Sequence, residues 1–333
     1  MPAEVAHVQS RRRANALTKT WNGSSISARD STDALGPRTH PVGKPRTMKN
    51  RYVLTLRCED RPGIVAGVTT LLFSEGGNIL EAQQFDDAET NGFFMRVVFA
   101  MGDSSESGGE AGFRRGMAKI ADDFKMDWRL RPEHARTKAL IMVSQLDHCL
   151  LDLLYHVRSR ELPMDVVAIA SNHPRSAHPT LDDSIPYHHF PITASTKPQQ
   201  EAQVRQLIES TGAELVILAR YMQILSDDLN QFLSGRCINI HHSFLPAFKG
   251  AKPYHQAHHR GVKIIGATAH YVTADLDEGP IIAQDVERVT HSDSVQTLIN
   301  KGREIERRVL TRAVALHLED RVLLNGAKTV VFA

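Results

Sequence analysis

The sequence predicts an α/β protein with a small ferredoxin-like βαββαβ domain followed by a Rossmann-like domain that has a mainly parallel sheet. A length of 333 residues fits two domains. From residue 51 onward, strand-like and helix-like patterns alternate. The apolar run 139–143 lacks polar alternation, which is typical of a strand covered on both faces. We place the boundaries at residues 1–48, 49–133 and 137–333.

The first 48 residues form a segment of different composition. It is rich in Arg, Ser, Thr, Pro and Gly, poor in acidic residues and without apolar periodicity, so we expect it to be disordered. Its character resembles an organelle transit peptide. Equally, it could be upstream sequence translated from a misassigned start, with Met48 as the true first residue. Both origins stay open.

Charge, cysteine content and hydropathy exclude several classes. The net charge is +2, and both signs are interspersed from about residue 50, so nucleic acid is not an expected partner. The 3 cysteines form no Cys-x-x-Cys pair, which argues against a disulfide framework and a thiolate zinc site. No apolar run reaches the ~18 residues that a membrane span needs. We therefore expect a cytoplasmic protein of small-molecule metabolism.

The first domain follows the order βαββαβ. Alternating Tyr52, Leu54 and Leu56 predict its first strand. The other elements are expected at Ile64–Phe73 (helix), Ile79–Phe85 and Gly92–Met101 (strands), Phe113–Phe124 (helix) and Asp127–Leu130 (strand). With the sequence Asp60-Arg61-Pro62-Gly63-Ile64-Val65 at the first turn and Gly77-Asn78-Ile79 before the second strand, this order resembles the ACT regulatory domain.

The turn before the first helix is the candidate regulatory site. Pro62 suits a first helical turn, Gly63 allows close backbone approach, and free amides at the helix start can receive a carboxylate. The resemblance implies an amino-acid effector, plausibly glycine or methionine, held by Asp60, Arg61, Pro62, Gly63 and Asn78, and it implies a homo-oligomer. The alternative is an ordinary helix start without a ligand.

The second domain alternates strands and helices. Strands are expected at residues 139–143, 165–170 and 215–218, and helices at 147–160, 199–211 and 295–317. Such alternation predicts right-handed crossovers and a parallel sheet.

Two segments of this domain carry polar groups suited to chemistry. Asn239 and His241 alternate with Ile238 and Ile240, so they share one face of a strand near its carboxyl end, where ligands bind in α/β sheets. A second strand at His270 leads into an acidic loop that contains Asp277. Hydrolysis of a carbonyl compound needs an oxyanion donor, an acid or base and a carboxylate for water. Asn239, His241 and Asp277 supply these groups.

The pattern Asn-x-His…Ser-x-Leu-Pro, followed by His-x-x-x-x-x-x-Asp-x-Gly-Pro, resembles the formyltransferase family. The resemblance implies that Asn239, His241 and Asp277 are catalytic. It also implies a pterin pocket in which Met222, Leu225, His270, Thr273 and Asp275 contact the folate. For Met222 and Leu225, simple core packing is the alternative.

The segment Ser144–Leu150 bears on the acceptor. It has no glycine, and Asp147 adds negative charge at a helix start, so it does not suit a phosphorylated acceptor. No further basic domain follows residue 317, which disfavours tRNA. An ACT domain joined to a formyltransferase core resembles the formyltetrahydrofolate deformylases. This implies that water receives the formyl group of the substrate 10-formyltetrahydrofolate, with no bound cofactor, supplying formate for purine biosynthesis and balancing folate pools.

In the expected mechanism, Asp277 takes a proton from water, Asn239 donates to the formyl oxygen, and protonated His241 stabilises the oxyanion. Burial should raise the pKa of Asp277, and a cationic His241 should lower it. The sequence does not decide between these effects.

Three other functions stay open at this stage. They are formyl transfer to an amine without phosphate, a folate-binding regulator, and a metallohydrolase that uses His255, His258 and His259. Arg260 lies beside these histidines and favours a solvated helix face instead, so no metal is expected.

Overall fold

A computed structural model describes residues 50–102, 109–245 and 253–333. All three stretches lie in the same unit of the chain. The predicted disordered segment at residues 1–48 lies outside the described residues, as does part of the segment after His241. Among the described helices, none is both long and apolar enough to cross a bilayer.

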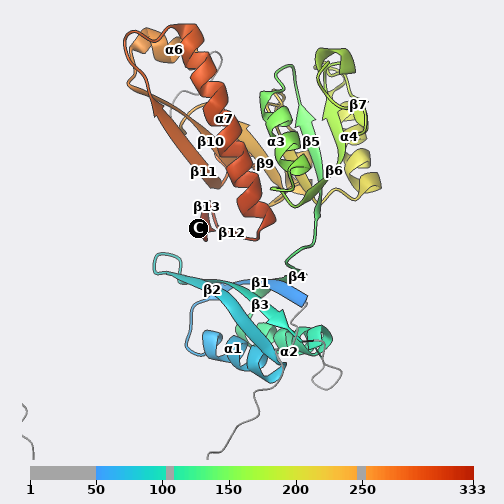
Figure 1. The fold of residues 1–333 in the computed structure, drawn as a ribbon, viewed down its shortest axis with the longest axis vertical. Helices are drawn as coiled ribbons and strands as arrows, with labels where there is room; N and C mark the ends of the chain where they lie inside the picture. Colours follow the sequence, from blue (N-terminus) through green and yellow to red (C-terminus); the bar gives the residue numbers. More distant parts are fainter. Residues whose placement is uncertain (1–49, 103–108, 246–252) are drawn as a thin grey trace, which may run out of the picture. The chain divides into compact units, whose positions relative to one another are not determined.

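Residues 50–102 and 109–132 form a four-stranded antiparallel sheet with two helices, in the predicted βαββαβ order (Figure 1). The strand order is β2-β3-β1-β4. Aromatic and aliphatic side chains of the sheet, including Phe99, pack against Val68 and Phe113 on the helices. The bounds are β1 Asn50–Glu59, α1 Ile64–Ser74, β2 Gly77–Asp87, β3 Gly92–Met101, α2 Gly109–Phe124 and β4 Asp127–Pro132.

The rest of the chain forms a seven-stranded sheet in the order β11-β10-β9-β8-β5-β6-β7. Strands β5 to β9 pair in parallel, which confirms the predicted mainly parallel sheet. Its strands are β5 Thr137–Val143, β6 Met164–Ser171, β7 Tyr187–His189, β8 Leu215–Leu218, β9 Cys237–His241, β10 Ile264–Tyr271 and β11 Ile281–Arg288. The helices are α3 His148–Arg158, η1 Arg175–Ala177, α4 Lys197–Thr211, α5 Asp227–Phe232, α6 Pro253–Arg260 and α7 Val295–Leu318.

Strand β5 explains the uninterrupted apolar run at residues 139–143. Ala139, Ile141 and Val143 enter the core on the face of α3 and α7, whereas Leu140 and Met142 enter the core on the other face with α4. Figure 1 shows α7 running across β9, β10 and β11, beside α3. Both faces of β5 are therefore buried, as expected for a central parallel strand.

The edge of this sheet differs from the sequence prediction. β10 pairs antiparallel with both β9 and β11, so residues after the acidic loop return as a strand. The chain also does not end with α7. A hairpin follows, β12 Val322–Asn325 and β13 Lys328–Val331, with Gly326 in a left-handed conformation.

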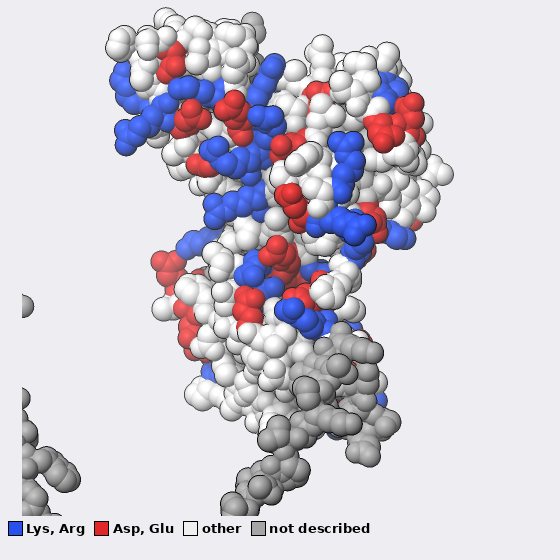
Figure 2. Space-filling view, in the orientation of Figure 1, with Lys and Arg blue, Asp and Glu red and all other residues white. Residues whose placement is uncertain are grey.

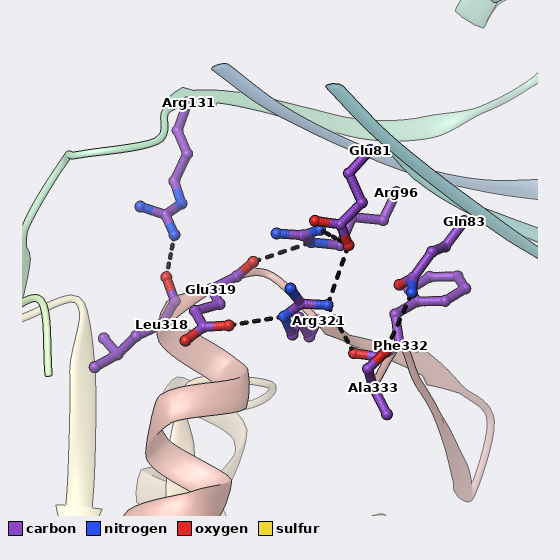
Figure 3. Close-up of polar contacts among 9 residues, drawn as sticks. All are labelled: Glu81, Gln83, Arg96, Arg131, Leu318, Glu319, Arg321, Phe332 and Ala333. Atoms are coloured by element: carbon purple, nitrogen blue, oxygen red, sulfur yellow. Dashed lines mark hydrogen bonds and ion pairs between the residues drawn. The ribbon is translucent and has the colours of Figure 1, made fainter. Parts of the chain in front are cut away.

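This C-terminal hairpin contacts the four-stranded sheet. Leu323, Val330 and Phe332 bury apolar surface against Phe94 of β3. Polar contacts surround that cluster, and Figure 3 shows those of Glu81 and Arg96 with the chain around Glu319 and Arg321. Arg131 donates to the Leu318 carbonyl and pairs with Asp320 at the end of α7.

Candidate active site

A cavity of about 670 Å³ opens where β8, β9 and β10 end. Asn239 and His241 line it from β9, His270 lines it from β10, and Asp277 lines it from the loop that follows β10. The carboxyl ends of the parallel strands β8 and β9 form such a crevice, and the antiparallel β10 borders it. The structure therefore brings together the three residues expected to act in catalysis.

Strand pairing fixes the orientation of Asn239. His270 lies directly opposite it in the antiparallel pair, and Asn239 Nδ2 is 3.2 Å from His270 Nε2. His270 Nδ1 is 2.9 Å from the Tyr271 carbonyl oxygen, which can only accept, so Nδ1 carries the proton. His270 Nε2 is then an acceptor for the Asn239 amide, and the second amide hydrogen of Asn239 stays available.

The Asp277 loop explains the Asp-x-Gly-Pro motif. Asp277 has a φ of 58°, and a Cβ at Gly279 would stand 1.7 Å from the Tyr271 carbonyl oxygen. Only glycine fits where the returning chain crosses Tyr271 so closely, and Tyr271 N bonds to the Pro280 carbonyl at 2.9 Å. This tight crossing brings Asp277 Oδ1 to 3.2 Å from His241 Nδ1 and to 3.8 Å from His270 Nε2.

The protonation of this group follows from its contacts. The hydrogen bond with His241 lowers the pKa of the Asp277 carboxyl and outweighs burial, which acts the other way. Burial lowers the pKa of His270, consistent with the neutral ring inferred above. The opposing effects on Asp277 that the sequence left undecided thus resolve in favour of an ionised carboxylate.

The expected folate contacts divide into exposed and buried groups. All five of them line the cavity. Met222 is 56% exposed, so it is not a core residue, whereas Leu225 belongs to the buried cluster around α4 and β8. Thr273 and Asp275 form a turn in which the Thr273 hydroxyl donates to the Asp275 carbonyl oxygen. His270 contacts Asn239 and Asp277, so it supports the polar group directly.

A second polar cluster lines the same cavity, and no pattern in the sequence predicts it. Glu306 of α7 is 1% exposed and accepts from His148 Nε2 at 2.8 Å and from the Tyr254 hydroxyl at 2.6 Å. Arg220 Nε lies 3.3 Å from the same carboxylate. Burial alone would raise the pKa of Glu306, but the His148 hydrogen bond and the Arg220 charge bring the pKa below its ordinary value. Glu306 is therefore an ionised, paired carboxylate.

The described residues that could hold a metal ion are not the histidines expected from the sequence. His255, His258 and His259 are exposed on α6, as a solvated face would be. In the described part of the chain, His148, Cys149 and Glu306 offer ligand atoms within 4.8 Å of one another. Burial raises the pKa of the Cys149 thiol, and Arg220 already faces the Glu306 carboxylate. A cation there would lie beside a guanidinium, so these residues do not suit a metal ion.

The candidate regulatory turn is exposed at the start of α1. Gly63 has a φ of 102°, and Arg61 donates to the Asp123 carbonyl oxygen. Asn78 is not close to this turn within one chain. Glu59, before the turn, pairs with Gly92, whereas Asn78 pairs with Ala100, which is about 26 Å farther along β3. The expectation of one site containing Asn78 and the turn is therefore wrong for a site built within a single chain.

Charged side chains of both signs are mixed on one face of the protein. On the face shown in Figure 2, Lys and Arg side chains lie among Asp and Glu side chains rather than in a continuous stripe. A basic stripe is the feature that nucleic-acid binding requires.

Comparisons with known proteins extend this description. Residues 137–314 match the formyl transferase family, and residues 52–108 match the ACT domain. The chain is 52% identical to formyltetrahydrofolate deformylase of Corynebacterium sp. (strain P-1), covering 84% of this chain and 98% of that protein. Its structure is similar to formyltetrahydrofolate deformylase of Burkholderia mallei, with a TM-score of 0.81, 53% identity, and 85% and 100% of the two chains covered. It is also similar to glycinamide ribonucleotide transformylase 1 of Symbiobacterium toebii, with a TM-score of 0.54, 28% identity, and 60% and 95% covered.

Proposed function

The chain belongs to the formyltetrahydrofolate deformylase family, and from this premise we propose that it hydrolyses 10-formyltetrahydrofolate to formate and tetrahydrofolate. The observation that carries the proposal is the contact of His241 with Asp277 beside an oriented Asn239 amide. These are a proton-transfer pair and a hydrogen-bond donor, the groups that attack of water on a formyl carbon requires.

We propose a role for each group, which the contacts in the cavity support. Asp277, ionised at neutral pH, orients water and takes its proton as the water oxygen bonds to the formyl carbon. The free amide hydrogen of Asn239 stabilises the developing oxyanion. The proton passes through His241 to the leaving nitrogen as the carbon–nitrogen bond breaks. His270 is a positioning residue, because its Nε2 holds the Asn239 amide in place. No step needs a metal or a bound cofactor.

The folate lies against the apolar side of the cavity. Met222 and Leu225 provide apolar contacts, and Thr273 and Asp275 provide backbone and side-chain polar groups from the loop after β10. The large exposed surface of Met222 is available to a planar ring.

The ACT domain suggests binding of an amino-acid effector. Glycine or methionine occupies the exposed amides at the start of α1, and the chain forms a homo-oligomer. The homo-oligomer is supported by β2, an edge strand on which Leu80 and Phe85 are 47% and 46% exposed. Because Asn78 is remote from the turn in one chain, it completes the effector site only from a neighbouring copy.

The test uses purified protein and 10-formyltetrahydrofolate without any amine, with formate and tetrahydrofolate measured. We expect equal amounts of both products. Asp277→Asn should lower kcat by about 10²- to 10⁴-fold, because it removes the base. Asp122→Asn, an exposed carboxylate on α2, is the matched control and should leave kcat unchanged. Absence of formate from the unmodified protein would refute hydrolysis.

A further inference from the structure

Arg220 stands out by its backbone. Among the described residues, six that are not glycine have a positive φ, and of these only Arg220 (φ 64°) and Asp277 (φ 58°) line the cavity. Glycine adopts this conformation without strain, whereas other residues keep it where the side chain is needed. The side chain of Arg220 therefore requires an explanation of the kind already given for Asp277.

The Arg220 guanidinium is directed into the protein instead of into solvent. The residue is 9% exposed, and its Nε and Nη1 atoms have no hydrogen bond among the described residues. Its neighbour is Glu306, 3.3 Å away, whose carboxylate is already bonded to His148 and Tyr254. The buried pair is neutral overall, and each Glu306 oxygen already accepts a hydrogen bond, Oε1 from Tyr254 and Oε2 from His148.

Tyr254 is fitted closely into this cluster. Its ring lies against the backbone of α7 at Gly302, where an added Cβ would be 2.1 Å from the ring. The imidazole of His242 connects the cluster to the catalytic group, since its ring centroid is 5.1 Å from that of His241 and 6.4 Å from that of Tyr254. The cluster therefore lines the cavity between His241 and α7.

We propose that Arg220 and Glu306 make the enzyme selective for water by closing this side of the cavity to an amine acceptor. The proposal rests on the proposed hydrolase function. Water fits beside Asp277, but a primary amine carries a substituent that would need the volume of the Arg220 side chain. An amine would also need an acceptor for its N–H groups, and Glu306 is the only carboxylate among the described residues of the cluster, already held by Arg220, His148 and Tyr254. The similar protein from Symbiobacterium toebii is named for an amine acceptor, so the fold itself does not exclude amines.

Arg220→Gly tests this proposal, because it removes the side chain and also relieves the left-handed backbone. The chemistry balances in both reactions. With water, the formyl carbon leaves the folate nitrogen for oxygen, giving formate; with an amine, it forms a new carbon–nitrogen bond, and the amine proton goes to the folate nitrogen. Purified protein would receive 10-formyltetrahydrofolate and excess glycinamide, and N-formylglycinamide and formate would both be quantified. Their ratio reports acceptor choice whatever the total rate.

We expect Arg220→Gly to raise the formamide-to-formate ratio at least about 10-fold above that of the unmodified protein. Arg220→Lys, which retains charge and bulk, should keep the formamide-to-formate ratio at that of the unmodified protein. Arg160→Gly is the matched control, since it relieves the same backbone strain (φ 62°) at an exposed position outside the cavity, and it should not change the ratio.

Folding is checked separately. If Arg220→Gly does not fold because Glu306 loses its counter-charge, the double variant Arg220→Gly with Glu306→Gln removes both charges and should also raise the ratio. An unchanged ratio in a folded variant that lacks Arg220 overturns the proposal. Loss of hydrolysis by the unmodified protein would instead overturn the proposed function, so the two failures are distinguishable.

Discussion

Two partly buried histidines give the protein a defined response to acid. Burial lowers the pKa of His242 and of His317 to about 4 from an ordinary value of 6.5. His317 Nδ1 lies 2.7 Å from the Tyr271 hydroxyl, which can donate a hydrogen bond to a neutral ring. An unfolded chain takes up protons on these side chains near pH 6.5, whereas the folded chain does so only near pH 4. Stability is therefore fully present above pH 6.5 and is lost as the pH falls toward 4.

We expect the free energy of unfolding to fall by about 2 kcal/mol per histidine between pH 7 and pH 5. His317→Gln keeps an acceptor for Tyr271 but cannot be protonated, so it should reduce this fall by about 2 kcal/mol. Urea unfolding at the two pH values measures the difference. His134→Gln is the control, because that side chain is 80% exposed. An unchanged pH response in His317→Gln would show that His317 does not titrate between the two states.

At the residue level, what the sequence reveals depends on distance along the chain. Asn239 and His241 are two residues apart on one strand, so alternation alone places them together. Arg220 and Glu306 are 86 positions apart in the numbering, and no local pattern links them. Glu306 looks like one more polar residue of a long amphipathic helix, and only the fold shows that it faces inward. A buried ion pair of this kind is formed by the tertiary structure.

Helix α7 depends on a glycine in its middle. Gly302 is the position at which the Tyr254 ring approaches the helix backbone. Glycine in a helix interior is destabilising by about 1 kcal/mol relative to alanine, so its presence indicates that a side chain does not fit. Because Gly302 has no side chain, α6 can pack closely on α7. This packing places the Tyr254 hydroxyl on Glu306.

Gly302→Ala should lower stability by about 1–3 kcal/mol, because the methyl group would overlap the Tyr254 ring and force a shift. Gly67→Ala in α1 is a matched change, since an added Cβ there meets nothing closer than 3.8 Å. It should raise stability by up to about 1 kcal/mol through helix propensity alone. Chemical denaturation of both variants decides the matter. A Gly302→Ala protein as stable as Gly67→Ala would contradict the packing.

At the level of elements, the sequence predicts those whose pattern repeats locally. The βαββαβ order and the parallel strands have clear periodicities and are confirmed. Strand β11 is not among the predicted elements, because its apolar Ile281 and Ile282 directly follow the acidic loop and the residues after Ala283 show no apolar alternation. The hairpin of β12 and β13 was also missed, although Asn325-Gly326 is a typical hairpin turn sequence.

The C-terminal hairpin contacts the four-stranded sheet through a small buried apolar cluster. Phe94 of the four-stranded sheet and Phe332 near the C-terminus are 4% and 7% exposed, in a cluster with Leu323 and Val330. Around this cluster, Arg96 donates to the Glu319 carbonyl oxygen and Arg321 pairs with Glu81 (Figure 3). Contacts of this type tie the sheet that carries the candidate effector site to the end of α7, the helix that also carries Glu306.

Phe332→Ala should therefore weaken the cooperativity of unfolding between the two sheets. Trp128 lies on β4, and a Trp21→Phe background leaves it as the only tryptophan of the 2 in the chain. Its fluorescence then reports the four-stranded sheet, while circular dichroism reports all secondary structure. We expect the two urea transitions to coincide in the background protein and to separate in Phe332→Ala, since loss of a buried aromatic side chain removes about 3 kcal/mol from their coupling.

The control is Phe73→Ala, which removes a phenyl group that is 80% exposed and should leave the transitions coincident within about 0.5 kcal/mol. If the transitions also coincide in Phe332→Ala, the polar contacts of Arg96, Arg131 and Arg321 suffice to couple the sheets, and the apolar cluster does not set the cooperativity.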